Sequence, residues 1–369
     1  MIPPRLRVVP FVALATVAAA AQAPAPAATP APAYAVQTIA PGVHVAVPTR
    51  PAGMLVESNN TFIVGEDGVV VVDTGFSPTL TRAALALLRT LTDEPVRTVV
   101  NTHWHDDHFL GNVVYAEAFP KAAFVAHRRF LAYVPTTGEA NRKGMLRDAG
   151  PFFADLRAAV AKNQTLQGQP LTDTARASAE ADLAQWAPYE RETPTVRIVL
   201  PTTPVDDALT LHQGKRLIEV KHLGRGHTAG DLVVWLPAER IAITGDLVLA
   251  PVPLIGADQS SVADWAKTLD ALLALKPAII VPGHGAVQRD TTYVERTRDL
   301  LRTIEAQATA SLRQGLSLEE AQKRLDLGSA RADFAGTDPA LLRQFDNFVA
   351  RSGVAAIYRE GKVKTTVVP

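Results

Sequence analysis

Three histidines and two aspartates fall within six consecutive positions, His103-Trp104-His105-Asp106-Asp107-His108. The apolar run Val96 to Val100 comes shortly before them and predicts a buried strand, which would hold the following loop in a fixed position. Isolated histidines are ordinary in proteins, but this many imidazole and carboxylate groups in one loop are typical of residues that share a cation. The segment therefore predicts a metal site at the end of a strand.

Three further short motifs each follow or end an apolar run and place glycine beside a histidine or an aspartate. They are Gly226-His227-Thr228-Ala229-Gly230-Asp231, Thr244-Gly245-Asp246 and Pro282-Gly283-His284-Gly285. Glycine allows the tight turn that brings a neighbouring side chain inward. The chain has no cysteine, so histidine and carboxylate must hold any metal, which suits Zn²⁺ and also Fe or Mn. With the first segment, the motifs supply seven ligands, enough for two ions.

The pattern of apolar runs predicts two groups of strands with helices outside them. Thr79 to Leu91 carries apolar residues at helical spacing, and residues 65–68 predict a hairpin turn. Strands are predicted at Val43 to Val47, Asn60 to Val64, Val69 to Val72, Val96 to Val100, Pro120 to Ala126, Val196 to Leu200, Leu209 to His212, Arg216 to His222, Asp231 to Leu236, Ile241 to Thr244 and Ala278 to Val281. We therefore expect an α/β protein built as a four-layer αββα sandwich.

Helical spacing replaces the strand pattern in two other parts of the chain. From about residue 128 to 191 we predict a helical insertion, with Pro151 in the first turn of one helix, and we expect it to shape the substrate pocket. Another helix is predicted over Ala263 to Leu275. Helices also fill the tail, residues 291–369, where Ser317 and Glu320 form a predicted capping box.

The first 33 residues differ in composition from the rest. Arg5 and Arg7 precede an apolar run, and Ala21-Gln22-Ala23 fits a small-x-small cleavage pattern, so residues 1–23 predict a secretory signal cleaved after Ala23. Residues 24–33 are almost only alanine and proline and predict an extended linker. The alternative is an uncleaved membrane anchor, for which the apolar run is short. We expect a periplasmic or secreted protein without stable membrane insertion after cleavage.

Charge and composition narrow the range of partners. The chain carries 37 Lys and Arg against 37 Asp and Glu. No excess positive charge is therefore present to bind phosphates, and nucleic acid is not an expected partner. The hydrophobic content of 47% is typical of a globular chain with a large core. The expected partner is a small-molecule substrate, and the oligomeric state stays open.

The four motifs, in this order, give the chain a family resemblance. From Gly42 to Val287 it resembles the metallo-β-lactamase superfamily of dinuclear hydrolases. The resemblance implies the αββα fold over residues 34–290, followed by a helical C-terminal extension over 291–369. It also implies the ligand sets: His103, His105 and His227 for one metal, Asp107, His108 and His284 for the second, and Asp246 bridging both. Asp73 matches a residue that supports the metal loop in this family, the alternative being an aspartate that only caps a turn.

A dinuclear zinc centre implies hydrolysis of a small molecule, with a metal-bridging hydroxide attacking a carbonyl or similar centre and Asp107 and Asp246 as the catalytic carboxylates. One alternative is a class B β-lactamase. The β-lactamases with a cysteine ligand at the position of Asp246 also carry a lysine shortly after it, and this chain has neither. Another alternative is a glyoxalase-II-like thioesterase, and lactones and sulfate esters stay open as substrates. A hypothesis of a different class is a non-catalytic metal-binding accessory protein.

For several other residues the sequence predicts a position or role other than metal binding. Trp104 is expected in the pocket wall or in packing, and Asp106 on an exposed loop. Arg225 is a candidate to bind a substrate carboxylate, the alternative being a solvated loop arginine. The segment Thr49 to Ser58 is expected to form a flap over the metals. The remaining histidines lack ligand spacing and are expected to be structural: His44, His127, His212 and His222.

Overall fold

The computed structural model describes residues 33–49, 57–256 and 259–366. The predicted signal sequence and nearly all of the Ala/Pro linker lie outside the described residues, as does most of the predicted flap from Thr49 to Ser58. Among the helices that are described, none has both the length and the apolar character needed to cross a membrane.

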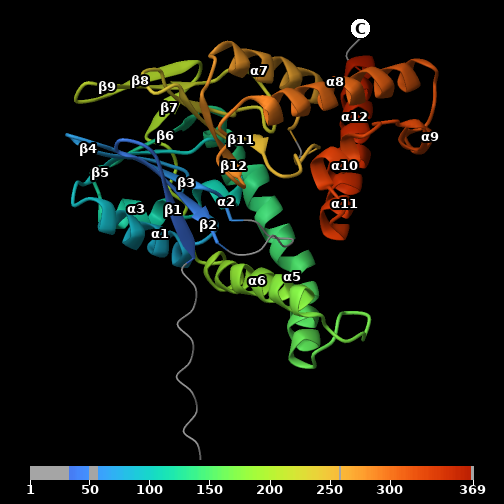
Figure 1. Ribbon diagram of the computed structural model, residues 1–369, viewed down its shortest axis with the longest axis horizontal. Coiled ribbons are helices and arrows are strands. Elements are labelled where there is room, and N and C mark those ends of the chain that lie inside the picture. The colour runs from blue at the N-terminus through green and yellow to red at the C-terminus, as the bar shows by residue number, and fades with distance from the viewer. Residues whose placement is uncertain (1–32, 50–56, 257–258, 367–369) are drawn as a thin grey trace, which may run out of the picture. The chain divides into compact units, whose positions relative to one another are not determined.

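The first sheet has seven strands, arranged in the order of the sequence (Figure 1). Neighbouring strands from β1 to β4 are antiparallel, and those from β4 to β7 are parallel. The strands are β1 (Tyr34–Ala40), β2 (Val43–Pro48), β3 (Asn60–Gly65), β4 (Gly68–Val72), β5 (Val96–Val100), β6 (Ala123–His127) and β7 (Thr203–Val205). The sequence analysis does not predict β1 or β7, and the other five overlap the predicted runs.

The second sheet has five strands in the order β12-β11-β10-β9-β8. Strands β8 to β11 form the predicted antiparallel meander, and β12 lies parallel to β11. The strands are β8 (Ala208–Gln213), β9 (Arg216–Lys221), β10 (Val233–Leu236), β11 (Ile241–Leu249) and β12 (Ile279–His284). The helix α7 (Val262–Ala274) connects β11 to β12, as parallel neighbours require.

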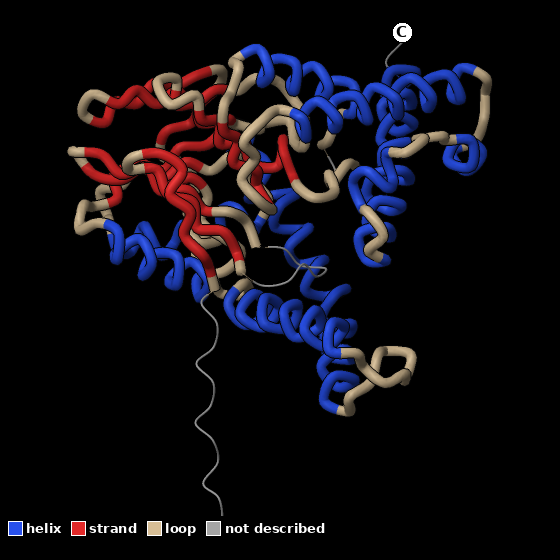
Figure 2. Tube along the Cα trace, in the orientation of Figure 1, coloured by secondary structure: helices blue, strands red, loops and turns tan. Residues whose placement is uncertain are grey.

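The two sheets pack face to face and are covered by helices on their outer faces (Figure 2). Val70 and Val72 of β4 belong to the core between the sheets, whereas the alternate Val69 and Val71 pack with α1 (Pro78–Leu91) and α3 (Asn112–Ala118). A strand buried on both faces has this continuous run of valines. On the other side, α7 and α8 (Thr292–Arg313) cover the second sheet. The predicted four-layer αββα sandwich is therefore confirmed.

Helices fill the chain between the neighbouring strands β6 and β7, as predicted. They are α4 (Arg129–Tyr133), η1 (Val134–Gly138), α5 (Glu139–Ala161) and α6 (Asp173–Glu192). The prediction that Pro151 begins a helix is wrong, because the residues from Glu139 onward are already helical and Pro151 lies inside α5. The strand predicted over Val196 to Leu200 is also wrong. Val196 and Ile198 pack against buried aromatic side chains of these helices, which include Phe153 and Trp186. The alternating apolar residues of this run are therefore explained by burial against helices and not by pairing in a sheet.

The tail from α8 onward is helical, as predicted. Its elements after α8 are α9 (Leu318–Arg324), α10 (Ala330–Ala335), α11 (Pro339–Phe345), η2 (Asp346–Arg351) and α12 (Ser352–Thr366). The capping box of Ser317 and Glu320 at the start of α9 is present. Phe345 and Val349 share a core with Val252 and Ile255, which follow β11. The tail therefore packs onto the second half of the sandwich through a common core.

Candidate metal centre

The seven predicted ligands come from five places in the fold, and strands of both sheets deliver them. His103 and His105 follow β5, and Asp107 and His108 lie in the short helix α2 (Asp106–Phe109). The others lie on or beside the second sheet: His227 between β9 and β10, Asp246 within β11 and His284 at the end of β12. Strand ends and glycine turns thus bring residues far apart in sequence to one place, as the motifs predict.

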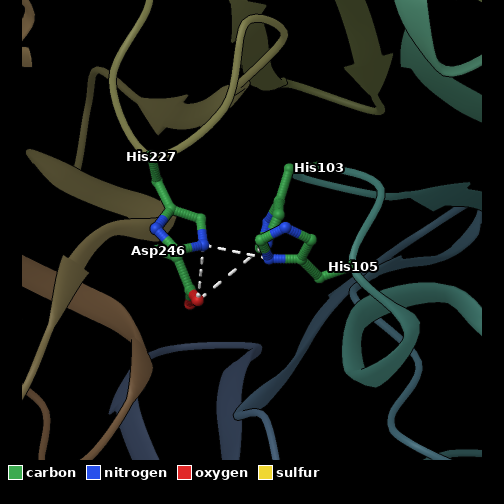
Figure 3. A group of neighbouring side chains, drawn as sticks. All are labelled: His103, His105, His227 and Asp246. Atoms are coloured by element: carbon green, nitrogen blue, oxygen red, sulfur yellow. Dashed lines mark hydrogen bonds and ion pairs between the residues drawn. The ribbon is translucent and has the colours of Figure 1, made fainter. Parts of the chain in front are cut away.

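These side chains form two adjacent groups. The first contains His103, His105, His227 and Asp246, and the second contains Asp107, His108 and His284. In each group the ligand atoms lie within 4.8 Å of one another. Figure 3 shows the first group, in which His227 Nε2 lies 3.0 Å from His105 Nδ1.

Asp246 contacts both groups. Its Oδ2 lies 3.4 Å from His227 Nε2 and 3.9 Å from His103 Nε2, in the first group. Its Oδ1 lies 3.3 Å from His108 Nε2 and 3.4 Å from His284 Nε2, in the second. The carboxylate is buried. One oxygen for each group is the arrangement expected of a ligand that bridges two cations.

Hydrogen bonds from the outer ring nitrogens orient three of the histidines. His284 Nδ1 lies 3.1 Å from the Glu57 carbonyl, and His227 Nδ1 lies 3.2 Å from the Leu254 carbonyl. His108 Nδ1 lies 2.8 Å from Asp73 Oδ2. An Nδ1–H that donates to these oxygens leaves the Nε2 lone pair facing the centre, which is the tautomer that binds a metal.

Asp73 is hydrogen-bonded to the segment that carries the first candidate ligands. Besides His108, its carboxylate accepts hydrogen bonds from the Thr102 backbone N–H and hydroxyl, both at 2.8 Å. The residue is buried and has a φ of 61°, in the left-handed region. A non-glycine residue at positive φ is uncommon and is retained where its surroundings fix it. The structure therefore places Asp73 where a supporting residue of the metal loop is expected.

Replacing Asp73 with alanine is expected to lower metal affinity by about 10–100-fold, the range for residues that orient a ligand through a hydrogen bond. The buried Thr102 N–H and His108 Nδ1 would lose their shared acceptor. Competition with a chromophoric chelator measures the affinity. Asp67→Ala is the matched control, since Asp67 also accepts a backbone hydrogen bond, from Gly214, but lies on an exposed turn. Equal affinity in the two variants would contradict a supporting role.

Burial and the charges of neighbouring groups shift the pKa values of the candidate ligands in opposite directions. Burial lowers the pKa of His227 to about 3. Burial also acts against charge on His284, but the carboxylates of Asp246 and Asp107 outweigh it and raise the pKa of His284 to about 10. Burial alone would favour protonated Asp107 and Asp246, yet the nearby histidines hold the pKa of both well below the usual range. Because metals bind neutral imidazole, loading a cation must expel the proton of His284.

The donor set fits metal ions. His103 Nε2 is buried, faces the centre and has no hydrogen-bond partner in the described part of the chain. A buried nitrogen without a partner is costly, and a cation would satisfy it. Imidazole nitrogens and carboxylate oxygens are also the ligand types preferred by Zn²⁺. The residues present could therefore hold one ion in each group.

A cavity of about 610 Å³ adjoins the centre, which is within the usual size range for small-molecule sites. Metal-group residues on its wall are His105, Asp107, Asp246 and His284. The insertion helices contribute Tyr133, Asn141, Arg142 and Met145, the end of β11 and the segment after it contribute Leu249 to Leu254, and the tail contributes Leu341, Gln344 and Phe348. Most of the lining is apolar; its charged residues are at or beside the candidate ligands and at Arg142, and the tail adds the polar side chain of Gln344.

Trp104 and Arg225 occupy different positions. Trp104 is buried, lines the cavity and stacks on Tyr133 with ring centroids 4.9 Å apart, so it serves both as wall and in packing. Arg225 is not among the described residues that line the cavity; it pairs with Asp264 at 3.6 Å on α7.

The expectation that Asp106 is exposed is wrong. Its carboxylate accepts hydrogen bonds from Arg142 Nε at 3.1 Å and from the Tyr189 hydroxyl at 2.8 Å. Arg142 belongs to α5 and Tyr189 to α6. These two helices cover Asp106, which the sequence could not show because Arg142 is 36 residues away. The insertion is thus attached directly to the segment that carries His105 and Asp107.

Sequence reasoning also missed two polar residues that precede β3. Glu57 is buried, accepts a hydrogen bond from the Phe76 N–H at 2.9 Å and lines the cavity. Burial raises its pKa to about 8. The Asn59 amide donates to the carbonyls of Pro282 and Gly285, both at 2.9 Å, and so holds the loop of His284. The available signal was the polar run Glu57 to Thr61 directly before an apolar strand.

Comparison with known families gives the fold and the centre a context. The family described as the metallo-beta-lactamase superfamily matches residues 54–284. The chain belongs to the metallo-beta-lactamase superfamily. The resemblance inferred from the motifs is therefore confirmed, and all seven candidate ligands lie within the matched segment of this superfamily member.

Relatives in the superfamily include sulfatases and β-lactamases. A linear primary-alkylsulfatase from Pseudomonas sp. is 26% identical over 306 residues, which cover 80% of this chain and 54% of that protein. An alkyl/aryl-sulfatase from Saccharomyces cerevisiae is 23% identical, covering 74% of this chain and 42% of that protein. A type 2 metallo-beta-lactamase from Bacteroides fragilis is 31% identical over 99 residues, which cover 26% of this chain and 39% of that protein. The chain thus spans about half the length, or less, of these relatives.

Two solved structures show the same fold. A stereoselective inverting sec-alkylsulfatase from Pseudomonas sp. superposes with a TM-score of 0.62 at 19% identity, covering 88% of this chain and 50% of that one. A metallo-beta-lactamase from Pontibacter korlensis gives a TM-score of 0.51 at 20% identity, covering 73% of this chain and 99% of that one. At these identities the likeness concerns the fold alone.

Proposed function

We propose that the protein is an exported, dinuclear metal-dependent hydrolase of small-molecule esters. The observation that carries the proposal is the position of Asp246, whose two oxygens each face the histidines of one group at the wall of the cavity. Two cations sharing this carboxylate would lie beside any molecule bound in the cavity. The superfamily to which the chain belongs supports the same reading.

The proposed ligands are His103, His105 and His227 for one ion, Asp107, His108 and His284 for the other, and Asp246 for both. Zn²⁺ is the proposed metal, with Fe or Mn as alternatives. Bound ions would supply a water activated at neutral pH and a Lewis acid beside the scissile bond. Asp107 lines the cavity, and 20% of its side chain is exposed. Because its pKa is held well below the usual range, the carboxylate is ionised and can accept a hydrogen bond from a water or substrate group. Trp104 and Tyr133 also line the cavity.

Export is proposed from the sequence. Residues 1–23 have the charged start, apolar run and small-x-small site of a secretory signal, followed by the Ala/Pro linker. The absence of cysteine is compatible with an oxidising compartment, where a free thiol would be open to oxidation. Comparing the N-terminus of the protein recovered from the periplasm or medium with that of the full chain tests cleavage after Ala23.

Sulfate esters are the proposed first substrate class. The match to the alkylsulfatase covers 80% of this chain, a larger share than residues 54–284, so that resemblance continues outside the superfamily segment. A mainly apolar cavity with charged groups at the candidate centre is also suited to a hydrocarbon group joined to an anion. Opening of a β-lactam ring is the second candidate, favoured by the local 31% identity to the Bacteroides fragilis enzyme.

The test is turnover of octyl sulfate, a chromogenic cephalosporin and a thioester by the purified protein, with metal content measured on the same sample. We expect release of sulfate from octyl sulfate with about two metal ions per chain. Rapid cephalosporin opening without sulfate release would instead establish the second candidate. Two bound metals without turnover of any ester, thioester or lactam would overturn the hydrolase proposal in favour of an accessory protein.

A further inference from the structure

One side of the cavity includes residues outside the superfamily segment. The match ends at residue 284, whereas Leu341 of α11 and Phe348 of η2 line the cavity beside Val252 and Leu254. We refer to Val252, Leu254, Leu341 and Phe348 as the apolar wall. These four side chains contain no polar atom and offer a bound molecule only apolar contact. The tail also places the amide of Gln344 on the cavity.

The apolar wall is held by the protein core. The Ile255 N–H donates to the Phe348 carbonyl at 2.8 Å, which ties the segment after β11 to η2. Gly256 packs closely on Ser352, since a Cβ added at Gly256 would lie 2.6 Å from the Ser352 Cβ. Val252 shares a hydrophobic core with Phe345 and Val349, which flank Phe348 on both sides. Such packing fixes the position of the apolar wall relative to β11, the strand that carries Asp246.

Phe348 is unusual among the wall residues because 43% of it is exposed. A single exposed hydrophobic residue is ordinary on a surface. This one, however, borders a cavity together with Leu341, which is only partly buried. Filling the cavity with hydrocarbon would remove both side chains from water, and burial of apolar surface is favourable.

The charged residues of the cavity lie at the candidate metal centre and the neighbouring Asp106–Arg142 pair. A molecule that meets both kinds of surface must carry a reacting polar group joined to a hydrocarbon group. We propose that Leu341 and Phe348 of the C-terminal tail select substrates by binding an extended hydrocarbon group of the molecule that is hydrolysed. The proposal rests on the hydrolase function proposed above and adds to it the class of substrate and the residues that choose it.

The first test is kcat/KM for n-alkyl sulfates of increasing chain length, kept below micelle formation, with the metal-loaded full chain. Each methylene that becomes buried is expected to raise kcat/KM by up to about fourfold. Phe348→Ala and Leu341→Ala are expected to flatten this dependence, with the largest losses of kcat/KM for the longest esters. Leu318→Ala is the matched control, because Leu318 lies in the same tail, is 39% exposed and is not among the described cavity residues.

Binding of n-alkyl phosphonates, measured by calorimetry on the same proteins, tests the apolar wall without requiring turnover. Affinity is expected to rise with chain length in the unaltered protein and in Leu318→Ala, and to rise much less in Phe348→Ala. A chain-length dependence that is absent, or unchanged in Phe348→Ala, would overturn the proposal. Failure of the hydrolase function is distinguishable, because it abolishes sulfate release at every chain length and leaves phosphonate binding measurable.

Discussion

Asp246→Asn is expected to fold normally, to lose most of its bound metal and to lower turnover more than about 100-fold, because losses of 10–100-fold already follow from residues that only support a ligand. Asparagine keeps the volume of the side chain but removes the charge and one of the two acceptor oxygens. Asp246 contacts the two groups through separate oxygens, at 3.3–3.4 Å. The one oxygen that asparagine keeps could face only one of them.

Metal content per chain and kcat/KM, measured alongside circular dichroism, check this expectation. Asp264→Asn is the matched control: it removes a carboxylate from α7, where Asp264 pairs with Arg225 away from the cavity. The control should keep two ions and full turnover. If Asp246→Asn also kept two ions, Asp246 would not be the bridging ligand.

Gly283→Ala is expected to impair the centre although it changes no ligand. A Cβ at this position would lie 2.0 Å from Asp246 Oδ1 and 2.8 Å from the Gly245 carbonyl carbon. Real Cβ atoms do not approach so closely, so β11, β12 or the Asp246 side chain must shift. We expect a loss of about 1–3 kcal/mol in the free energy of unfolding, as for other overpacked cores, together with weaker metal binding.

Thermal unfolding of the metal-free and metal-loaded forms, with chelator competition, measures both effects. Gly144→Ala is the control, since Gly144 lies in α5 and an added Cβ there comes no closer than 3.8 Å to a neighbouring atom. Alanine in a helix is expected to stabilise by about 0.5–1 kcal/mol. Should Gly283→Ala bind metal as tightly as Gly144→Ala, the close approach would have no bearing on the centre.

The parts of the site that the sequence predicts share one physical property: each candidate ligand stands beside a glycine or in the short segment that follows an apolar run. The end of a strand can be predicted locally, from the end of an apolar run. His103 to His108 and His284 could therefore be placed at or just after strand ends. The four-layer fold was predictable for a related reason. Runs such as Val69 to Val72 are apolar at every position, which is typical of strands buried on both faces.

The residues that the sequence could not place depend on partners far away in the chain. Asp106 is indistinguishable from a solvated aspartate until Arg142 is known to cover it, and nothing local marks Phe348 as part of a cavity wall. The run Val196 to Leu200 shows the opposite error. It has an apolar pattern suited to a strand, but the insertion helices supply the surface that buries Val196 and Ile198.

The hydrogen bonds from Asn59 to Pro282 and Gly285 also bear on when the candidate metal centre is assembled. They join positions 223 and 226 residues apart, and such contacts can form only when the long loop between them is closed. A nascent chain that ends before β12 contains His103 to His108 but lacks His284. The complete set of candidate ligands therefore comes together only after β12 has been synthesised and has joined the second sheet, not when the histidine-rich segment is made.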